Sequence, residues 1–169
     1  MDNSLPVVSA KMTFMDWPSP DDAAVIVYIA GCKHNCKNCQ SPDLQNPSDF
    51  PYSDIDHVVD ILIKYCKKYR TNKVVLSGGD PLYHNKQVQM MIDQMKKNGD
   101  YHFCIYTGFE FEEARNLISG YDFIKTGVFD DDQYQESEKT DEHMVLASKN
   151  QKFYNSKGKL LTKNGILKF

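Results

Sequence analysis

Along the central part of this chain, apolar residues follow two alternating patterns. Stretches rich in β-branched and other apolar residues predict strands, and the first of them is continuously apolar, as a strand covered on both faces would be. The strands are expected at residues 24–30, 73–77, 101–106 and 121–126. Between these runs, apolar residues recur at steps of three and four positions, which predicts helices. The helices are expected from Ser53 to about Arg70, around Val88–Met95 up to Asn98-Gly99, and from Glu110 to Gly120.

Strands that alternate with helices are typical of an α/β fold with right-handed crossovers and a largely parallel sheet. Each predicted strand runs into a loop that contains glycine, and these loops follow residues 30, 77, 106 and 126. The carboxyl ends of parallel strands lie at one rim, where such folds bind their ligands. We therefore expect a cysteine cluster after the first strand and a Gly-Gly-Asp-Pro turn after the second to form one site.

The size and net charge of the chain limit the classes of protein to which it can belong. Its 169 residues predict a single domain over 1–169, because one domain contains about 150 residues, and its core is expected at about 12–127. A net charge of -3 argues against a general nucleic-acid binder. The longest apolar run, 23–30, is too short to span a bilayer, and the first residues lack the pattern of a signal peptide. We expect a cytoplasmic protein with neither nucleic acid nor membrane as a partner.

The last part of the chain, residues 128–169, departs from the alternating pattern. Residues 130–142 contain seven acidic residues and one lysine, whereas residues 149–169 contain six lysines and no acidic residue. Charge runs are usually solvated, so we expect an acidic loop followed by a C-terminal hairpin around Ser156-Lys157-Gly158. A surface that docks a partner is the alternative interpretation.

The five cysteines are the main chemical signal. Three of them, Cys32, Cys36 and Cys39, lie within eight residues. Clustered thiols in a reducing compartment more often bind metal or do chemistry than form disulfides. A short loop can place three thiolates around one centre, and soft thiolates suit an iron–sulfur cluster. A cubane of four irons with three cysteine ligands keeps one iron free for a substrate or cofactor, as a catalytic metal keeps an open position.

Structural zinc is the alternative metal. His34 lies inside the loop and could complete a site with three cysteines and one histidine. However, no second cysteine pair or His-x3-His element lies nearby. Cys66 falls on the apolar face of a predicted helix and Cys104 in a predicted strand, so both are expected to be core thiols.

The spacing Cys32-x3-Cys36-x2-Cys39 after a first strand resembles the signature of the radical S-adenosylmethionine superfamily. The resemblance implies a partial (β/α) barrel with mostly parallel strands, in which the three cysteines hold a [4Fe-4S] cluster. It also implies that the unligated iron chelates S-adenosylmethionine, and that an electron from the cluster cleaves this cofactor to methionine and a 5′-deoxyadenosyl radical. The protein then contributes positioning and the exclusion of water.

Four segments together resemble the family of anaerobic ribonucleoside-triphosphate reductase-activating proteins. They are residues 31–42, 76–82, 106–113 and 147–151. The resemblance implies abstraction of a hydrogen atom from a glycine of the large subunit of the anaerobic reductase, which leaves a glycyl radical. It further implies a reduced flavodoxin-like or ferredoxin-like electron donor.

The same resemblance implies which residues contact the cofactor. They are Asn38, Cys39, Gln40, Gly78, Gly79, Asp80 and Tyr106. No acid or base beyond the cluster is required, so His34 is expected to be an ordinary loop residue. The chain departs from the usual pattern at Asn38, where many radical enzymes have an aromatic residue, and at Thr126, where the family often has an aspartate.

Two other functions are compatible with the residues. The first is a radical enzyme that acts on a small molecule, such as a deazapurine precursor. The second is an interaction module without catalysis that zinc stabilises. The content of iron or zinc separates the zinc module from both radical enzymes.

Overall fold

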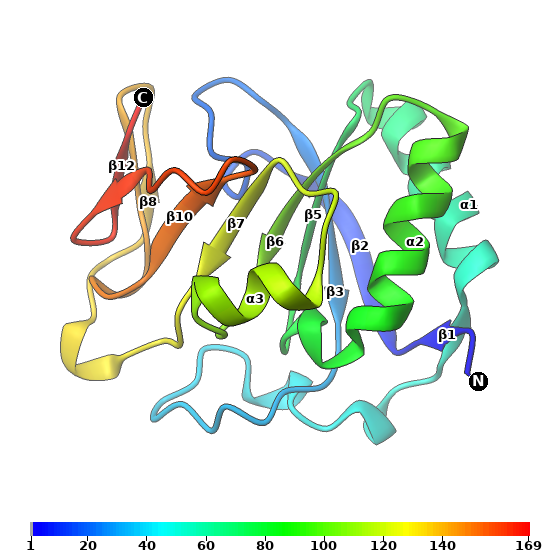
Figure 1. Cartoon of the computed structure of the whole chain (residues 1–169), viewed down its shortest axis with the longest axis horizontal. Coiled ribbons are helices and arrows are strands. Elements are labelled where there is room, and N and C mark those ends of the chain that lie inside the picture. The colour runs from blue at the N-terminus through cyan, green and yellow to red at the C-terminus, as the bar shows by residue number, and fades with distance from the viewer. Residues whose placement is uncertain (1) are drawn as a thin grey trace.

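The computed structural model describes residues 2–169, and its centre is a six-stranded sheet (Figure 1). In spatial order the strands are β10 (Lys152–Asn155), β7 (Phe123–Thr126), β6 (His102–Tyr106), β5 (Lys73–Gly78), β3 (Ala24–Ile29) and β2 (Val7–Thr13). The four inner strands are mutually parallel, whereas β10 and β2 pair antiparallel at the two edges. The expected α/β fold with a largely parallel central sheet is therefore confirmed, and the sheet order ends at β10 and β2 as in a partial barrel.

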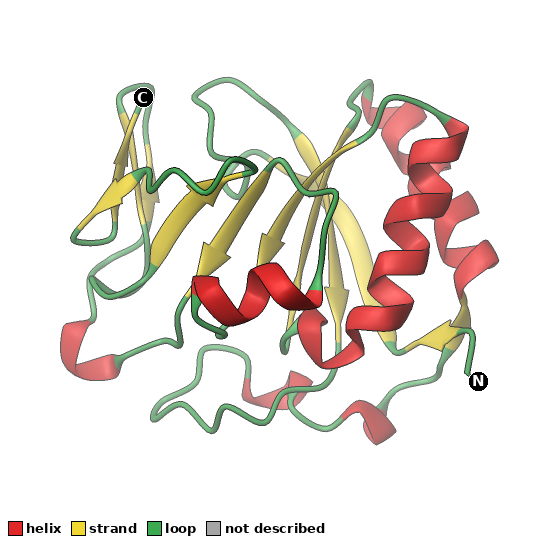
Figure 2. Cartoon of the chain, in the orientation of Figure 1, coloured by secondary structure: helices red, strands yellow, loops and turns green. Residues whose placement is uncertain are grey.

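Three α-helices cover one face of this sheet (Figure 2). They are α1 (Ile55–Tyr69), α2 (Asn85–Asn98) and α3 (Phe111–Leu117). The first helix begins one residue later than the sequence predicts, because Asp54 is its cap and accepts a hydrogen bond from the Asp56 N–H at 2.9 Å. Ser53 and Asp54 form the short strand β4 (Ser53–Asp54), which pairs with β1 (Ser4–Leu5). The remaining helical turns are η1 (Pro42–Leu44), η2 (Pro47–Asp49), η3 (Pro81–His84) and η4 (Asp131–Gln133).

Successive residues of the inner strands are buried in two different cores. Val27, Leu76 and Ile105 belong to the core beneath the helices, whereas their neighbours toward the N-terminus belong to a second core on the opposite face. This alternation explains why the strands are continuously apolar. Cys66 and Cys104 are buried in these two cores, which confirms that they are core thiols. Burial raises the pKa of the Cys66 thiol to about 11.

A small four-stranded sheet covers part of the second face. Its strands, in spatial order, are β11 (Thr162–Lys163), β12 (Ile166–Lys168), β9 (His143–Val145) and β8 (Glu138–Lys139). Met144, Leu146 and Leu167 pack from this side onto the central sheet. The small sheet lies beside β10, and the chain reaches it from the carboxyl end of β7 through a loop that contains η4 (Figure 1).

The structure of residues 128–169 is more extensive than the expected loop and hairpin. A turn does occur at residues 156–158, where the Asn155 N–H donates to the Lys159 carbonyl at 3.1 Å. However, β10 joins the central sheet, and part of the acidic segment forms β8. Strands of two to four residues are too short for a periodic pattern, so the sequence did not indicate them.

The N-terminal residues also form strands that the sequence did not predict. Residues 7–13 form the edge strand β2, whose residues are mostly exposed or half-buried and therefore lack a continuous apolar run. Within residues 2–169, every helix is too short or too polar to cross a membrane.

Candidate functional site

A cavity of about 370 Å³ lies at the carboxyl ends of the parallel strands, on the face opposite the helices. Its wall contains the thiol-bearing residues Cys32, Cys36 and Cys39, which all follow β3, and also Gly78 and Gly79 at the end of β5. The expected meeting of the cysteine cluster with the Gly-Gly-Asp-Pro turn is therefore confirmed. Residues of the C-terminal segment also line the cavity, among them Glu138 and Leu146.

The cysteine loop leaves the sheet and returns to it through paired backbone bonds. The Gly31 N–H donates to the Leu44 carbonyl at 2.7 Å, and the Cys32 N–H donates to the Gln45 carbonyl at 2.9 Å. Residues 31–45 therefore form a closed loop whose base is fixed at the end of β3. Gly31 has a positive φ of 111°, a conformation that L side chains rarely adopt. The loop thus holds the three cysteines beside the cavity.

The three thiols have the chemistry that a sulfur-ligated cluster requires. All three are free of disulfides and half-buried. Burial, together with the negative charge of Asp80 and neighbouring thiols, raises the pKa of the Cys32 thiol. Burial likewise raises the pKa of Cys36. A bound iron centre would displace these protons, since only thiolates ligate metal. The donor set of three soft sulfurs on one cavity wall fits an iron–sulfur cluster whose fourth side faces the cavity.

Within residues 2–169, no group of three or more histidine, cysteine, aspartate and glutamate residues is arranged to hold a single metal ion. The His34 ring, which a zinc site of three cysteines and one histidine would need, has its Nε2 atom 2.6 Å from the Asp80 carboxylate. His34 therefore already has a protein partner at that nitrogen.

The two glycines of the Gly-Gly turn permit the close approach of β3 and the cysteine loop. A Cβ atom on Gly78 would lie 2.2 Å from the Ile29 carbonyl oxygen, and one on Gly79 would lie 2.6 Å from the Gly31 carbonyl oxygen. The Gly79 and Asp80 N–H groups donate to these same two carbonyls, at 2.9 and 2.8 Å. The Gly-Gly turn is therefore joined by backbone hydrogen bonds both to the end of β3 and to the start of the cysteine loop.

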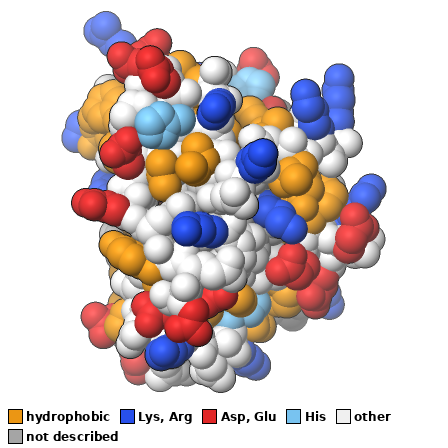
Figure 3. Space-filling model, turned by 90° about the vertical axis from the view of Figure 1, so that its left-hand side faces the viewer, with side chains coloured by type: hydrophobic (Ala, Val, Ile, Leu, Met, Phe, Trp, Pro, Cys, Tyr) orange, Lys and Arg blue, Asp and Glu red, His pale blue; other side chains and the backbone are white. Residues whose placement is uncertain are grey.

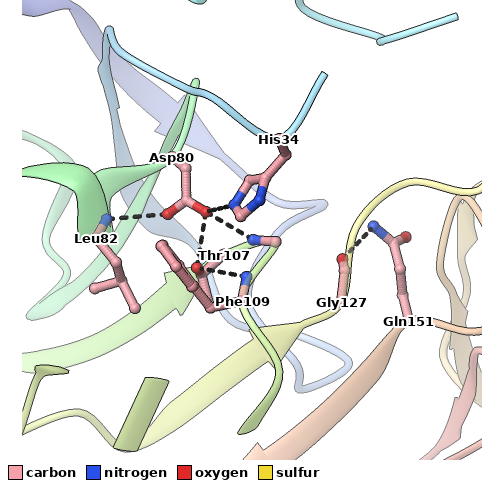
Figure 4. A network of polar contacts seen from close by, with 8 residues as sticks. His34, Asp80, Leu82, Thr107, Phe109, Gly127 and Gln151 are labelled. Carbon is pink, nitrogen blue, oxygen red and sulfur yellow. Dashed lines mark hydrogen bonds and ion pairs between the residues drawn. The ribbon is translucent and has the colours of Figure 1, made fainter. Parts of the chain in front are cut away.

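The Asp80 carboxylate connects three of the loops at this rim (Figure 4). One oxygen accepts from the Thr107 hydroxyl at 2.9 Å and from the Gly108 N–H at 2.8 Å, and it also contacts His34. The other oxygen accepts from the Leu82 N–H at 3.0 Å. The carboxylate is fully buried, so these four partners replace the water that would otherwise solvate it.

The expectation that His34 is an ordinary loop residue was wrong. Its side chain is only 13% exposed, and its ring lies 5.2 Å from that of Tyr83 and 4.9 Å from that of Phe109. The absence of a side chain at Gly108 makes room for it, since a Cβ there would lie 2.5 Å from the His34 ring. The histidine thus joins the cysteine loop to the loops after β5 and β6.

The other residues predicted to contact a cofactor are distributed between the cavity and its rim. Gln40 and Tyr106 line the cavity together with Cys39 and the two glycines. Asn38 is directed elsewhere, because its amide donates to the Asp131 carboxylate at 2.7 Å. Asp80 is enclosed in its own hydrogen-bond network behind the cavity wall. Its position therefore suits a role in holding the loops together.

The acidic segment contacts the cysteine loop. Besides the bond from Asn38 to Asp131, the Lys37 ammonium lies 3.7 Å from the Asp132 carboxylate, although both of these side chains are well exposed. Exposed ion pairs contribute little stability. The side of the molecule formed by the C-terminal sheet shows acidic and basic side chains interspersed with hydrophobic ones (Figure 3).

The segment 147–151, one of those that carried the resemblance, supports the loop after β7. The Gln151 amide donates to the Gly127 carbonyl at 3.4 Å, as Figure 4 shows. The Asn150 amide donates to the Val128 carbonyl at 2.8 Å, and the Ser148 hydroxyl accepts from the Asp130 N–H at 3.2 Å. The C-terminal segment thereby fixes the loop that lines one side of the cavity.

The sequence analysis missed Lys125, which lies on β7 and lines the cavity. Its Nζ lies 4.4 Å from the centre of the Tyr106 ring. Burial lowers the pKa of this lysine to about 8, although Asp16 and other nearby acids act in the opposite direction. Burial also raises the pKa of Tyr106, whose hydroxyl donates to the Asp16 carbonyl at 2.6 Å. A lysine in the interior of the predicted strand 121–126 was the available signal.

Comparison with known proteins finds a family whose model matches this chain. The model of a family described as "4Fe-4S single cluster domain" matches residues 23–154. This match confirms the expected [4Fe-4S] cluster. The crystal structure of QueE from Escherichia coli is similar, with a TM-score of 0.49 and 16% sequence identity. The similarity covers 62% of this chain and 53% of the QueE chain. This chain therefore spans about half the length of QueE. The sequence matches no curated protein.

Proposed function

The chain belongs to the 4Fe-4S single cluster domain family, and from this premise we propose that it is a radical S-adenosylmethionine enzyme that activates an anaerobic ribonucleotide reductase. One observation carries the proposal: Cys32, Cys36 and Cys39 line the same cavity as the glycines of the Gly-Gly turn. A cluster held by these thiols would therefore face a space in which a cofactor can bind. When bound, the two cofactors supply the electron and the 5′-deoxyadenosyl radical that abstracts a hydrogen atom.

The residues of this chain have three tasks in the proposed reaction. The three cysteines hold the cluster. We expect the carbonyl oxygens of Gly78 and Gly79 to receive the amino group of S-adenosylmethionine, since backbone carbonyls are the acceptors that these two glycines offer. The cavity lies within the range of about 300 to 1,000 Å³ that small-molecule sites occupy. A substrate that covers its open side would keep water from a reactive radical.

The resemblance of segments 31–42, 76–82, 106–113 and 147–151 to reductase-activating proteins supports a protein substrate. The first three of these segments form loops at the cavity rim, and the last fixes the loop after β7 through Gln151. In this proposal the glycine-bearing part of the large reductase subunit enters the cavity, and a reduced flavodoxin-like or ferredoxin-like protein supplies the electron.

A radical enzyme that acts on a small molecule is the second candidate. The observation that favours it is the small C-terminal sheet, from which Glu138 and Met144 line the cavity. A wall supplied by the chain itself suits a substrate that is enclosed by this protein alone.

The test uses protein reconstituted with iron and sulfide in the absence of oxygen. It is mixed with S-adenosylmethionine, a reductant and the large subunit of a candidate anaerobic reductase. We expect a glycyl radical on the reductase by electron paramagnetic resonance, and 5′-deoxyadenosine in proportion to it. A reductase with alanine at the target glycine is the control and should give no such signal.

Two results would contradict the proposal at different levels. Cofactor cleavage that transfers no radical to any reductase, but does convert a small heterocycle, supports the second candidate. A reconstituted protein that holds zinc and no iron, and forms no 5′-deoxyadenosine, overturns both radical functions.

A further inference from the structure

The cysteine loop has one contact that neither its base nor its histidine provides. Backbone bonds fix the base of the loop, and the histidine ring joins it to the loops after β5 and β6. Residues 35–40, which include two of the three cysteines, lie between these attached residues. Among the described residues, a single hydrogen bond between side chains joins this segment to another part of the chain. The Asn38 amide donates it to the Asp131 carboxylate, at 2.7 Å.

Asn38 has a backbone conformation that suits its residue type. Its φ is 53°, in the left-handed region that asparagine adopts more readily than most residues. The residue is exposed and does not line the cavity. The next residue along the chain is Cys39, the third thiol of the motif. A bond that holds the Asn38 side chain therefore also restrains the backbone that places the Cys39 thiol.

The three successive aspartates of the acidic segment have different contacts. The Asp130 carboxylate stays within its own turn, where it accepts from the Asp132 N–H at 3.0 Å and from the Gln133 amide at 2.6 Å. The Asp132 carboxylate lies 3.7 Å from the Lys37 ammonium, and both of these side chains are well exposed. Asp131 is half-buried, and its carboxylate is the one that accepts a hydrogen bond from the cysteine loop.

The turn that carries Asp131 is itself fixed to the C-terminal segment. The Asp130 N–H donates to the Ser148 hydroxyl at 3.2 Å, and the Lys149 N–H donates to the Gln133 carbonyl at 3.0 Å. Ser148 is fully buried, so this attachment is formed in part by the interior of the protein. A series of contacts thus runs from the C-terminal segment through Asp131 to the cysteine loop.

We propose that Asp131 is a positioning residue for the cluster: by binding Asn38, it holds Cys39 where the three thiolates can ligate one [4Fe-4S] cluster. The proposal rests on the radical-enzyme part of the proposed function, because it requires the cluster, but it does not depend on the substrate. Without this bond, the turn at Asn38 is free to change its backbone angles, and such changes move the third thiolate away from the other two. A hydrogen bond to an ionised carboxylate is stronger than one between neutral groups, so a single bond favours the ligating conformation.

The experiment measures how fast the anaerobically reconstituted protein loses iron to an excess of a ferrous-iron chelator. Asp131→Ala removes the acceptor, and Asn38→Asp places two carboxylates against each other. The double variant Asn38→Asp/Asp131→Asn restores the pair with donor and acceptor exchanged. Asp132→Ala is the matched control, since it removes the same charge from the same turn but breaks only an exposed ion pair. Urea unfolding of each variant before reconstitution shows that it is folded.

We expect Asp131→Ala to lose iron about 3- to 10-fold faster than the wild type, because one charge-assisted hydrogen bond is missing. Asn38→Asp should lose iron about tenfold faster or more, since like charges repel each other. The double variant and Asp132→Ala should stay within about twofold of the wild type. The electron paramagnetic resonance spectrum of the reduced cluster, which reports the arrangement of its ligands, should change in the first two variants and match the wild type in the other two.

Three results overturn the positioning role while the proposed function stands. The first is an Asp131→Ala variant that loses iron as slowly as the wild type. The second is equal acceleration by Asp131→Ala and Asp132→Ala, which indicates a general effect of acidic charge. The third is a double variant that loses iron as fast as Asn38→Asp, because the exchanged hydrogen bond then has no effect on the loop. By contrast, a wild-type protein that binds no iron overturns the proposed function itself.

Discussion

Each end of the central sheet carries an aspartate that joins a histidine to a backbone N–H group, but only one of the two pairs is enclosed. At the carboxyl ends, the Asp80 carboxylate is fully buried and lies 2.6 Å from His34. At the amino ends, the Asp122 carboxylate is 35% exposed and lies 3.1 Å from His102. Asp122 also accepts from the Phe103 N–H at 2.9 Å. The two pairs therefore have similar chemistry in different surroundings.

The difference shows at which end of the sheet protein hydrogen bonds have replaced water around a carboxylate. Asp80 has four protein partners, drawn from the cysteine loop and from the loops after β5 and β6. Water still reaches Asp122 and competes for its bonds. Each end also has a hollow with a cysteine in its wall, namely Cys36 in the cavity at the carboxyl ends and Cys66 in a second hollow at the amino ends. The carboxyl end is thus built to hold several loops in fixed positions around one space.

The largest effect is expected from the cysteines of the two hollows. Cys36→Ala should lose the cluster and all reductive cleavage of S-adenosylmethionine, because two thiolates and a methyl group cannot replace three thiolates. The Cys66→Ala variant lacks a buried thiol at the amino ends of the strands and should bind as much iron as the wild type. Iron content and 5′-deoxyadenosine formation, measured on both variants after anaerobic reconstitution, check this. Formation of 5′-deoxyadenosine by Cys36→Ala would refute the assignment of this ligand.

The two aspartates give the next comparison. Asp80→Asn places an amide where the carboxylate accepts several hydrogen bonds, and should lower the free energy of unfolding by about 2 to 4 kcal/mol. Asp122→Asn should lower it by less than about 1 kcal/mol, because solvent replaces part of what is lost. Urea unfolding of the two variants measures the difference. Equal losses would mean that burial of the Asp80 network contributes nothing beyond its hydrogen bonds.

The sequence predicted the part of the fold whose residues have regular surroundings. The helices and the inner strands face a continuous core, so their apolar residues recur at the periods of a helix or appear as unbroken runs. The cysteine motif was also readable, because its three ligands lie in one short loop. These features depend on residues that are close together in the chain.

The rest depends on contacts between distant residues. His34 and Asp80 are 46 positions apart, and neither lies in a pattern that indicates the other. Lys125 was hidden because its orientation into the cavity depends on the register of β7 with β6. The strands of the C-terminal sheet contain two or three residues each, and only their pairing with one another makes them regular.

The smallest expected effect compares two glycines, one at each end of the sheet. A Cβ on Gly79 would lie 2.6 Å from the Gly31 carbonyl oxygen and 2.7 Å from the Leu44 carbonyl oxygen, and both atoms belong to the backbone. At Gly99, the nearest atom would be part of the Tyr101 side chain, at 3.0 Å, and the backbone there is extended with φ of 168°. A side chain can move aside, whereas the paired backbone at the base of the cysteine loop cannot.

We therefore expect Gly79→Ala to lower the free energy of unfolding by about 1 to 3 kcal/mol, and Gly99→Ala by less than about 1 kcal/mol. Since the contacts of Gly79 include the first residue of the cysteine loop, Gly79→Ala should also bind less iron on reconstitution, while Gly99→Ala binds as much as the wild type. Urea unfolding and iron analysis of both variants provide the measurement. If Gly79→Ala loses stability but keeps its full iron content, the cysteine loop can form the cluster without a fixed base, and the close approach serves the fold alone.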